Sequence, residues 1–204
     1  MQIVRHVNSF HTSNSYLLVH EKENGVWVID PGDSEFILNW LSLQKHFLMG
    51  ILVTHSHYDH IYGICDLKKA YPDVSVYASK ECIEGMQSAK RNLSEYLEIP
   101  YIVKDVSFEI LEDKDRLWLW KETEMIIHYT PGHNLESLSF QIDINLFTGD
   151  ALLPGVKVYT KFWGGNRLTS QETIKRIIAN FSSEQLIWPG HGEPCKLGQC
   201  EIIL

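Results

Sequence analysis

The order of strand-like and helix-like segments constrains the fold of this chain more than any other feature. Segments rich in Val, Ile, Leu, Tyr and Trp at 2–7, 14–20 and 25–30 predict strands, and the turn residues Asn24-Gly25 favour a hairpin between the last two. From residue 34 onward, helix-spaced apolar positions alternate with short apolar runs. Because this alternation packs helices against a sheet, the predicted class is layered α/β.

The remaining elements follow the same rules of spacing. A helix is predicted from residue 34, with Asp33 or Ser34 available as its cap, and residues 90–104 are expected to be an irregular excursion because Pro100 interrupts a mixed pattern. Strands are predicted at 49–53, 74–78, 106–111, 116–120, 125–129, 137–142, 145–148 and 185–189, and further helices at 59–71, 79–89 and 170–180. Both halves begin with strands and end with helix then strand, which suits two similar sheets stacked face to face with helices outside.

Composition and charge narrow the classes of function. The 204 residues fit one domain, predicted as residues 1–204, and 44% hydrophobic residues supply a globular core. A net charge of −8 gives no general attraction to nucleic acid or to anionic lipid, and no apolar run approaches the roughly 20 residues of a membrane span. The amino-terminal segment lacks the apolar stretch of a secretory signal, so a cytoplasmic location is expected. Reduced thiols are expected at all four cysteines, Cys65, Cys82, Cys195 and Cys200.

A dense group of metal-binding residue types follows the apolar strand 49–53. Four of them fall within six positions, which composition does not explain: His55, His57, Asp59 and His60. Imidazole nitrogens and carboxylate oxygens are preferred ligands of zinc and similar ions. His55 and His57 are expected to project to the same side of an extended stretch. Asp59 and His60 lie beyond the turn and would reach a second position several ångströms away.

Three further candidate ligands stand in turns after predicted strands. His133 and His191 each come directly after Pro-Gly, and Asp150 follows Thr148-Gly149. A stiff turn at a strand end places such side chains at the edge of the sheet, where ligands converge in layered α/β folds. Each residue type also has an ordinary alternative, since Asp59 could cap a helix, Asp150 could serve its turn, and a lone histidine is more often hydrogen-bonded than a ligand. The joint order of the motifs favours metal binding.

The ordered motifs resemble those of the metallo-β-lactamase-fold hydrolases, and within that superfamily they look most like the glyoxalase II-like group. The motifs are His-x-His-x-Asp-His from His55, Pro-Gly-His at His133, Thr-Gly-Asp at Asp150 and Pro-Gly-His-Gly at His191. The resemblance begins at Asp30 and implies an αβ/βα four-layer sandwich with the site at one edge of two sheets. It also implies the ligand sets of two metals: one is held by His55, His57 and His133, the other by Asp59, His60 and His191, and Asp150 bridges both.

The resemblance implies a metal-dependent hydrolase. Two divalent ions, expected to be Zn²⁺ with Fe or Mn as alternatives, lower the pKa of a shared water toward roughly 7 and polarise an ester-like carbonyl. Asp59 would orient the resulting hydroxide and pass a proton to the leaving group. The expected substrates are thioesters, lactones or other small ester-like molecules. Glyoxalase II carries a further helical part that binds glutathione, and this part is not expected because the chain ends soon after His191.

Other residues complete the expected site. Asp30, at a strand end beside Pro-Gly, would orient an imidazole ligand through a hydrogen bond. A stretch after the bridging aspartate would line the substrate pocket: Tyr159, Phe162, Trp163, Asn166 and Arg167. The five histidines inside regular segments are assigned no function: His6, His11, His20, His46 and His128.

Three other functions stay open. They are oxidation of a persulfide at a single iron, nucleic-acid processing similar to that of ribonuclease Z, and a non-catalytic sensor that keeps the metal. No basic cluster supports the second of these. The substrate, the metal and the oligomeric state stay open as well.

Overall fold

The chain folds as two compact units. The computed structural model describes residues 1–204, with Met1–Ile110 forming the first unit and Leu111–Leu204 the second. Each unit is built around one six-stranded sheet with helices beside it. None of the helices combines the length and the apolar character that crossing a bilayer requires. The expectation of one domain over 1–204 stays a prediction.

The first unit contains a mixed sheet with strand order β1-β2-β3-β4-β5-β6. Its strands are β1 (Gln2–Val7), β2 (Asn14–Val19), β3 (Gly25–Ile29), β4 (Phe47–Leu52), β5 (Val76–Ala78) and β6 (Phe108–Ile110). The predicted hairpin is confirmed, because β2 pairs antiparallel with β3. From β3 to β6 the pairing is parallel.

The parallel strands β3 and β4 bring two candidate site residues to one edge of this sheet. All five residues of β3 and the last three of β4 are buried, as expected for unbroken apolar runs covered on both faces. Parallel strands end at the same edge, where α/β proteins place their ligands. Asp30 follows β3, and its backbone N donates to Leu52 O at 2.9 Å. His55 therefore leaves the sheet next to Asp30.

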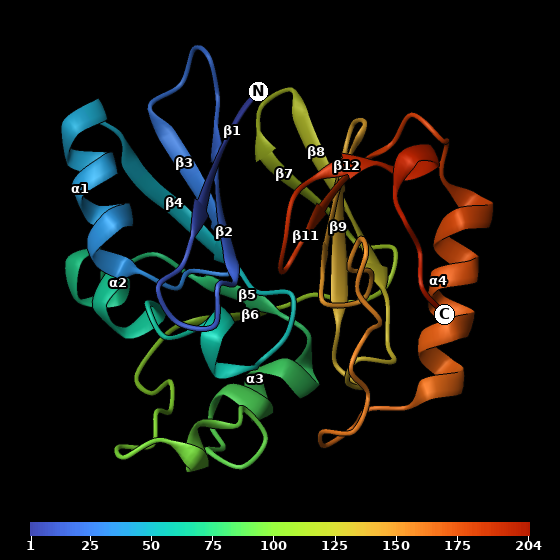
Figure 1. Cartoon of the computed structure of the whole chain (residues 1–204). Helices are drawn as coiled ribbons and strands as arrows, with labels where there is room; N and C mark the ends of the chain where they lie inside the picture. Colours follow the sequence, from blue (N-terminus) through green and yellow to red (C-terminus); the bar gives the residue numbers. More distant parts are fainter. The chain divides into compact units, whose positions relative to one another are not determined.

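Three α-helices and two short 3-10 helices complete the first unit. They are α1 (Ser34–Gln44), η1 (Tyr58–His60), α2 (Ile64–Ala70), α3 (Lys80–Met86) and η2 (Ser94–Tyr96). α1 and α2 lie along the same side of the sheet (Figure 1). Within α1, the buried side chains are Ile37 and Leu41, one turn apart, as the helical spacing predicted.

The prediction of one continuous helix over 59–71 is wrong, because the chain breaks between η1 and α2. Gly63 N donates to Pro31 O at 3.0 Å, and a Cβ atom at Gly63 would lie 2.3 Å from Gly32 O. The backbone therefore passes so close to the turn at 31–32 that only glycine fits. This contact turns the chain before α2 begins.

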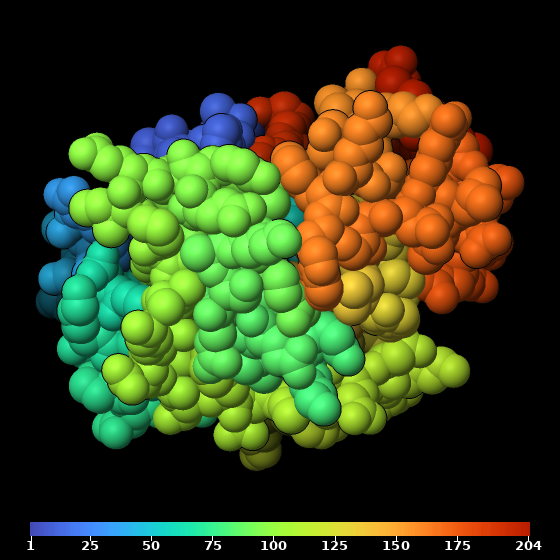
Figure 2. Space-filling view, turned by 90° about the horizontal axis from the view of Figure 1, so that it is seen from below, coloured from blue at the N-terminus to red at the C-terminus, as the bar shows by residue number.

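Residues 90–104 are irregular apart from η2, as predicted. Figure 2 shows this stretch, in green, spread over one face of the first unit. Asn92 Nδ2 and Ser94 Oγ both donate to Tyr101 O at 2.8 Å, and Asn92 O accepts from Tyr58 N at 2.8 Å. The stretch is thereby fastened to η1, the helix that carries Asp59 and His60.

Asp33 occupies the N-cap position of α1 without a side-chain capping bond. Its carboxylate instead accepts hydrogen bonds from Ser9 N at 2.9 Å, from Ser9 Oγ at 2.7 Å, from His6 Nε2 at 2.8 Å and from the Tyr62 hydroxyl. Of the two residues that the sequence offers as cap, Asp33 takes the position, but its side chain does not cap the helix because His6, Ser9 and Tyr62 use its oxygens. Burial raises the pKa of Asp33, but the hydrogen bonds from Tyr62, His6 and Ser9 outweigh it and lower the pKa to about 2.

Replacing Asp33 by Asn is expected to remove a pH-dependent part of the stability. A carboxyl whose folded pKa lies below its model value of 3.8 stabilises the fold above that value and loses this contribution as the pH falls toward about 2. Urea unfolding should find Asp33→Asn less stable than the parent by about 1 kcal/mol near pH 6, with the difference closing toward pH 2. Asp105→Asn, at an exposed carboxylate, is the control and should show no such gap. A difference that stays constant with pH would contradict the assignment.

The second unit contains a sheet with strand order β12-β11-β10-β9-β8-β7. Its elements are β7 (Arg116–Trp120), β8 (Thr123–Tyr129), β9 (Leu138–Ile142), β10 (Asn145–Gly149), α4 (Arg167–Asn180), β11 (Leu186–Pro189), β12 (Cys195–Lys196) and η3 (Leu197–Gln199). Only β10 and β11 pair parallel; the other neighbours are antiparallel. α4 packs Ile174 and Ile177 against a core that includes Leu146 and Ile187.

The expectation of four reduced thiols is wrong for the two cysteines in the carboxyl-terminal part of the second unit. Cys195 and Cys200 form a disulfide, whereas Cys65 and Cys82 are free. The short strand β12 and the turn of η3 bring the two Cα atoms to 5.9 Å, within the range that a disulfide spans. Sequence reasoning missed this strand because two residues carry no detectable period.

Candidate metal centre

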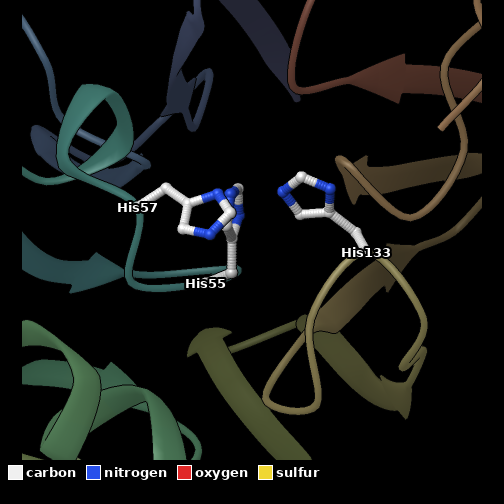
Figure 3. A group of neighbouring side chains, drawn as sticks. All are labelled: His55, His57 and His133. Carbon is white, nitrogen blue, oxygen red and sulfur yellow. The ribbon is translucent and has the colours of Figure 1, made fainter. Parts of the chain in front are cut away.

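The first unit gathers four candidate ligands directly after β4. His55, His57 and His60 are almost completely buried, with exposed fractions of 0%, 4% and 0%. Figure 3 shows His55 and His57 on the turn that leaves β4, and their rings lie edge to face with centroids 4.7 Å apart. The predicted projection of these two histidines to one side is consistent with this contact. Asp59 and His60 follow in η1.

A hydrogen-bond network around Asp30 orients two of these imidazoles. Asp30 accepts from Thr54 N at 2.7 Å with Oδ1, and from Thr54 Oγ1 at 2.6 Å and His60 Nδ1 at 3.1 Å with Oδ2. Since Thr54 Oγ1 gives its proton to Asp30, it accepts from His55 Nδ1 at 3.0 Å. The protons on both Nδ1 atoms are assigned from these partners, and they leave the lone pair of each neutral ring on Nε2.

The backbone at Asp30 is held in a conformation that suits this role. Its φ is +51°, a left-handed value that aspartate tolerates better than most residues. Ser15 Oγ donates to Asp30 O at 2.6 Å and accepts from Gly32 N at 2.9 Å, which fixes the turn. The carboxylate is thereby turned back toward Thr54 and His60. This contact agrees with the predicted orienting role of Asp30, which stays a prediction because it presupposes the metal.

The second unit supplies the other three candidates, beginning with His133 on the loop after β8. Figure 3 shows His133 projecting from this loop. A Cβ atom at Gly132 would lie 2.3 Å from Ser170 Cα, so the loop lies directly against α4. Asn166 N donates to Gly132 O at 2.9 Å, and Thr173 Oγ1 donates to Pro131 O at 2.7 Å. The absence of a side chain at Gly132 thus lets the loop backbone contact the backbone of α4. This contact fixes the position of the backbone that carries the His133 side chain.

The Asp150 carboxylate is faced by two imidazoles of the same unit. Its Oδ2 atom lies 3.5 Å from His133 Nε2 and 3.6 Å from His191 Nε2. His133 Nδ1 donates to Tyr159 O at 2.7 Å, so the lone pair of the neutral His133 ring is on Nε2. Asp150 is 7% exposed, and His133 is 4% exposed.

The chemistry of these donors fits divalent cations. His133 Nε2 and Asp150 Oδ2 are both electron-rich and face each other at 3.5 Å, beyond a normal hydrogen bond. His60 Nε2 and Asp59 Oδ2 stand in the same relation at 3.5 Å in the first unit. Two such atoms repel unless a positive charge lies between them. Asp30, His55 and His60 also place one potential ligand atom each within 4.8 Å of one another.

The five residues predicted to line a substrate pocket are found in several environments. The side chains of Tyr159, Phe162 and Trp163 are 48%, 39% and 42% exposed, and the rings of the first two lie 4.6 Å apart. Asn166 Oδ1 accepts from Thr169 N at 3.0 Å as the N-cap of α4, and Arg167 is the exposed first residue of that helix. Their role at a pocket stays a prediction.

Two contributors to the site were missed by sequence reasoning. Thr54 joins Asp30 to His55 through one hydroxyl group. Its position directly before His55 was the available signal, because a hydroxyl at a strand end can bond the neighbouring imidazole. The other contributor is the backbone carbonyl of Tyr159, which holds His133. A carbonyl gives no signal in a sequence.

Two mixed sheets and clustered His and Asp donors define a class of layered α/β proteins with metal-binding residue groups. Residues 9–183 match the family model described as the Metallo-beta-lactamase superfamily, and the chain belongs to this superfamily. The predicted family and fold class are therefore confirmed.

Individual relatives agree with this assignment. A hydroxyacylglutathione hydrolase of Photobacterium profundum is 33% identical over 153 residues, which cover 74% of this chain and 52% of that protein. The chain thus spans about half the length of the curated relatives it matches. BLEG-1 B3 metallo-beta-lactamase has a TM-score of 0.89 at 23% identity, covering 97% of this chain and 95% of that one. TTHA1623, solved in a di-iron-bound form, has a TM-score of 0.83 at 24% identity, covering 96% and 95%.

Proposed function

We propose that this chain is a metal-dependent hydrolase of thioesters or related small esters. In this proposal the donors of the first unit and those of the second serve one centre of two divalent ions. His55, His57 and His133 would hold one ion, Asp59, His60 and His191 would hold the other, and Asp150 would be shared by both. Zn²⁺ is the proposed metal, with Fe or Mn as alternatives.

One observation carries the proposal furthest: a single carboxylate oxygen of Asp150 faces the Nε2 atoms of His133 and His191 at nearly equal distances, 3.5 and 3.6 Å. An oxygen that approaches two imidazole nitrogens in this way suits a ligand shared between two cations. The orienting bonds from Asp30, Thr54 and the Tyr159 carbonyl add support, because metal-bound histidines are typically held through their other ring nitrogen.

The ions, when bound, supply Lewis acidity and a water acidified to near-neutral pH. The chain supplies the rest of the chemistry. Asp59, whose Oδ2 lies 3.5 Å from His60 Nε2, is placed to orient the attacking water and to carry a proton to the leaving group. Burial of His55, His57 and His60 excludes bulk water from their nitrogens, which strengthens the electrostatic effect of any charge held there.

The substrate class is proposed from the relatives. The name hydroxyacylglutathione hydrolase describes cleavage of an acyl group from glutathione, which is a thioester bond. Because the chain matches only about half of that protein, the acyl-thiol bond is carried over here and the glutathione part is not. The exposed rings of Tyr159, Phe162 and Trp163 offer an apolar surface for a small acyl or thiol group.

Metal content and turnover measured on the same sample test the proposal. Protein expressed without added metal should carry up to about two transition-metal ions per chain and should hydrolyse at least one member of a panel of acyl-thioesters and lactones. Exhaustive chelation should remove the metal and the activity together, and added Zn²⁺ should restore both. Turnover that survives complete removal of the metal would contradict the proposal.

Assays of the same samples distinguish the proposed hydrolase from the other functions that the sequence left open. Oxygen uptake with a persulfide substrate by iron-loaded protein, without hydrolysis, would replace the proposal with oxidation chemistry. Inactivity of fully metal-loaded protein on the whole panel would favour a sensor that keeps the metal. Because one protein of the same fold, TTHA1623, was solved in a di-iron-bound form, iron and zinc are compared in the same assays.

A further inference from the structure

The second unit contains a cavity that none of the proposed metal ligands lines. Its volume is about 500 Å³, within the range of roughly 300–1,000 Å³ typical of small-molecule sites. The sheet strands β8 and β9, the carboxyl-terminal half of α4 and the turns at 113–114 and 181–185 form its walls. We propose that this cavity binds a small organic anion, a carboxylate or phosphate attached to an aromatic or apolar body.

Two cations in the lining of the cavity supply the charge for this ligand. Lys114 makes a backbone hydrogen bond to Ile127 O at 2.8 Å, but its ammonium group takes part in no ion pair. Arg176 donates through Nη2 to the backbone O of Tyr129, which anchors the guanidinium and leaves its other donors for a ligand. Because the chain as a whole carries a charge of −8, a cavity lined by these two cations and a single carboxylate, Asp113, departs from the overall charge.

The one acidic side chain of the lining, Asp113, is hydrogen-bonded to the backbone and not to either cation. Asp113 Oδ1 accepts from Tyr129 N at 2.7 Å, and its carboxylate forms no ion pair with either Lys114 or Arg176. The backbone of Tyr129 is therefore held from both sides, by Asp113 at its N and by Arg176 at its O. These hydrogen bonds hold Arg176 and the turn that carries Lys114 to the same strand, β8, and two cations in the lining of a concave site favour a carboxylate or phosphate.

The rest of the lining suits the body of such a ligand. The rings of His128 and Phe181 meet edge to face with centroids 5.2 Å apart, which gives an aromatic wall. His128 Nε2 is hydrogen-bonded to Gln141 Oε1 at 2.9 Å, and the buried side chains of Thr130 and Gln185 lie in the lining. The Asn180 amide makes no side-chain hydrogen bond and can meet a polar substituent.

The experiment uses benzoate as the probe, with phenyl phosphate and neutral benzamide beside it. Titration of the metal-loaded 204-residue chain at low salt, followed by backbone-amide NMR, should shift the amides of Lys114, His128 and Asn180. Lys114→Gln should weaken benzoate binding about tenfold, the effect of losing one charged hydrogen bond. Lys121→Gln, at an exposed lysine of the same unit outside the cavity, should leave the affinity within about twofold.

Each outcome decides the proposal. Tighter binding of phenyl phosphate than of benzoate would assign the anion as a phosphate, and the reverse order would assign a carboxylate. Benzamide binding as tightly as benzoate would overturn the role of charge. Equal affinities of Lys114→Gln and Lys121→Gln, or shifts absent from the cavity amides with both anions, would overturn the site. Because Lys114 has no side-chain partner, its replacement should leave the fold intact, and the amide spectrum reports this directly.

Discussion

Asp150→Ala is expected to remove metal and turnover together. Its Oδ2 lies 3.5 Å from His133 Nε2 and 3.6 Å from His191 Nε2, so its loss removes the negative charge that both imidazoles face. Metal content should fall to about one ion per chain or less, and kcat/KM on the best thioester should fall by at least about 10³-fold. Elemental analysis and steady-state kinetics on the same preparation measure both quantities.

The control for this variant is Glu172→Ala, which removes an exposed carboxylate from α4 in the same unit. It should keep the full metal content and activity. Circular dichroism and urea unfolding of the metal-free proteins should show that Asp150→Ala retains its fold. Full metal occupancy with unchanged turnover in Asp150→Ala would contradict the bridging role, and metal loss in Glu172→Ala would show that the effect is not specific.

Thr54→Val is expected to weaken metal binding without touching a proposed ligand. Valine keeps the shape of threonine but loses the hydroxyl that donates to Asp30 Oδ2 at 2.6 Å and accepts from His55 Nδ1 at 3.0 Å. Loss of such an orienting bond typically lowers metal affinity about 10- to 100-fold. The metal-free fold should also lose about 1.5–3 kcal/mol, since the bond to Asp30 is a buried bond to a charged group. Competition with a chromophoric chelator measures the affinity.

The matched control is Thr123→Val at the start of β8, where the hydroxyl makes no side-chain hydrogen bond. Its zinc affinity should equal that of the parent. Thr54→Ser, which keeps the hydroxyl, should recover most of the affinity and so separates hydrogen bonding from packing. Unchanged affinity in Thr54→Val would remove Thr54 from the account of the site, even if its stability fell.

Most of the secondary structure followed from local patterns. Buried strands such as β3 and β4 are continuous apolar runs, and α1 has clear helical spacing, so each carries its signal in adjacent residues. The wrong predictions concern elements whose limits are set by contacts with backbone far away in the sequence. The helix predicted over 59–71 broke at Gly63 because the turn at 31–32 packs against it. The two-residue strand β12 formed because β11 lies beside it.

For the candidate site, too, some features could be predicted from the sequence and others could not. The identities and order of the ligand candidates were evident in the sequence, because His and Asp after strand ends are rare enough to stand out. Their orientation was not, since it depends on partners far along the chain. Asp30 reaches Thr54 across 24 positions, and Tyr159 O reaches His133 across 26.

The sequence by itself determined which atoms can bind metal and which strand ends present them, because residue type and period are local properties. The tertiary structure decided which ring nitrogen of His55, His60 and His133 is assigned the proton, the disulfide between Cys195 and Cys200, and the cavity beside α4. These features depend on which backbone or side-chain atom arrives next to another after folding. Which atoms become neighbours is set by the packing of whole helices and strands, and no short stretch of residues determines this packing.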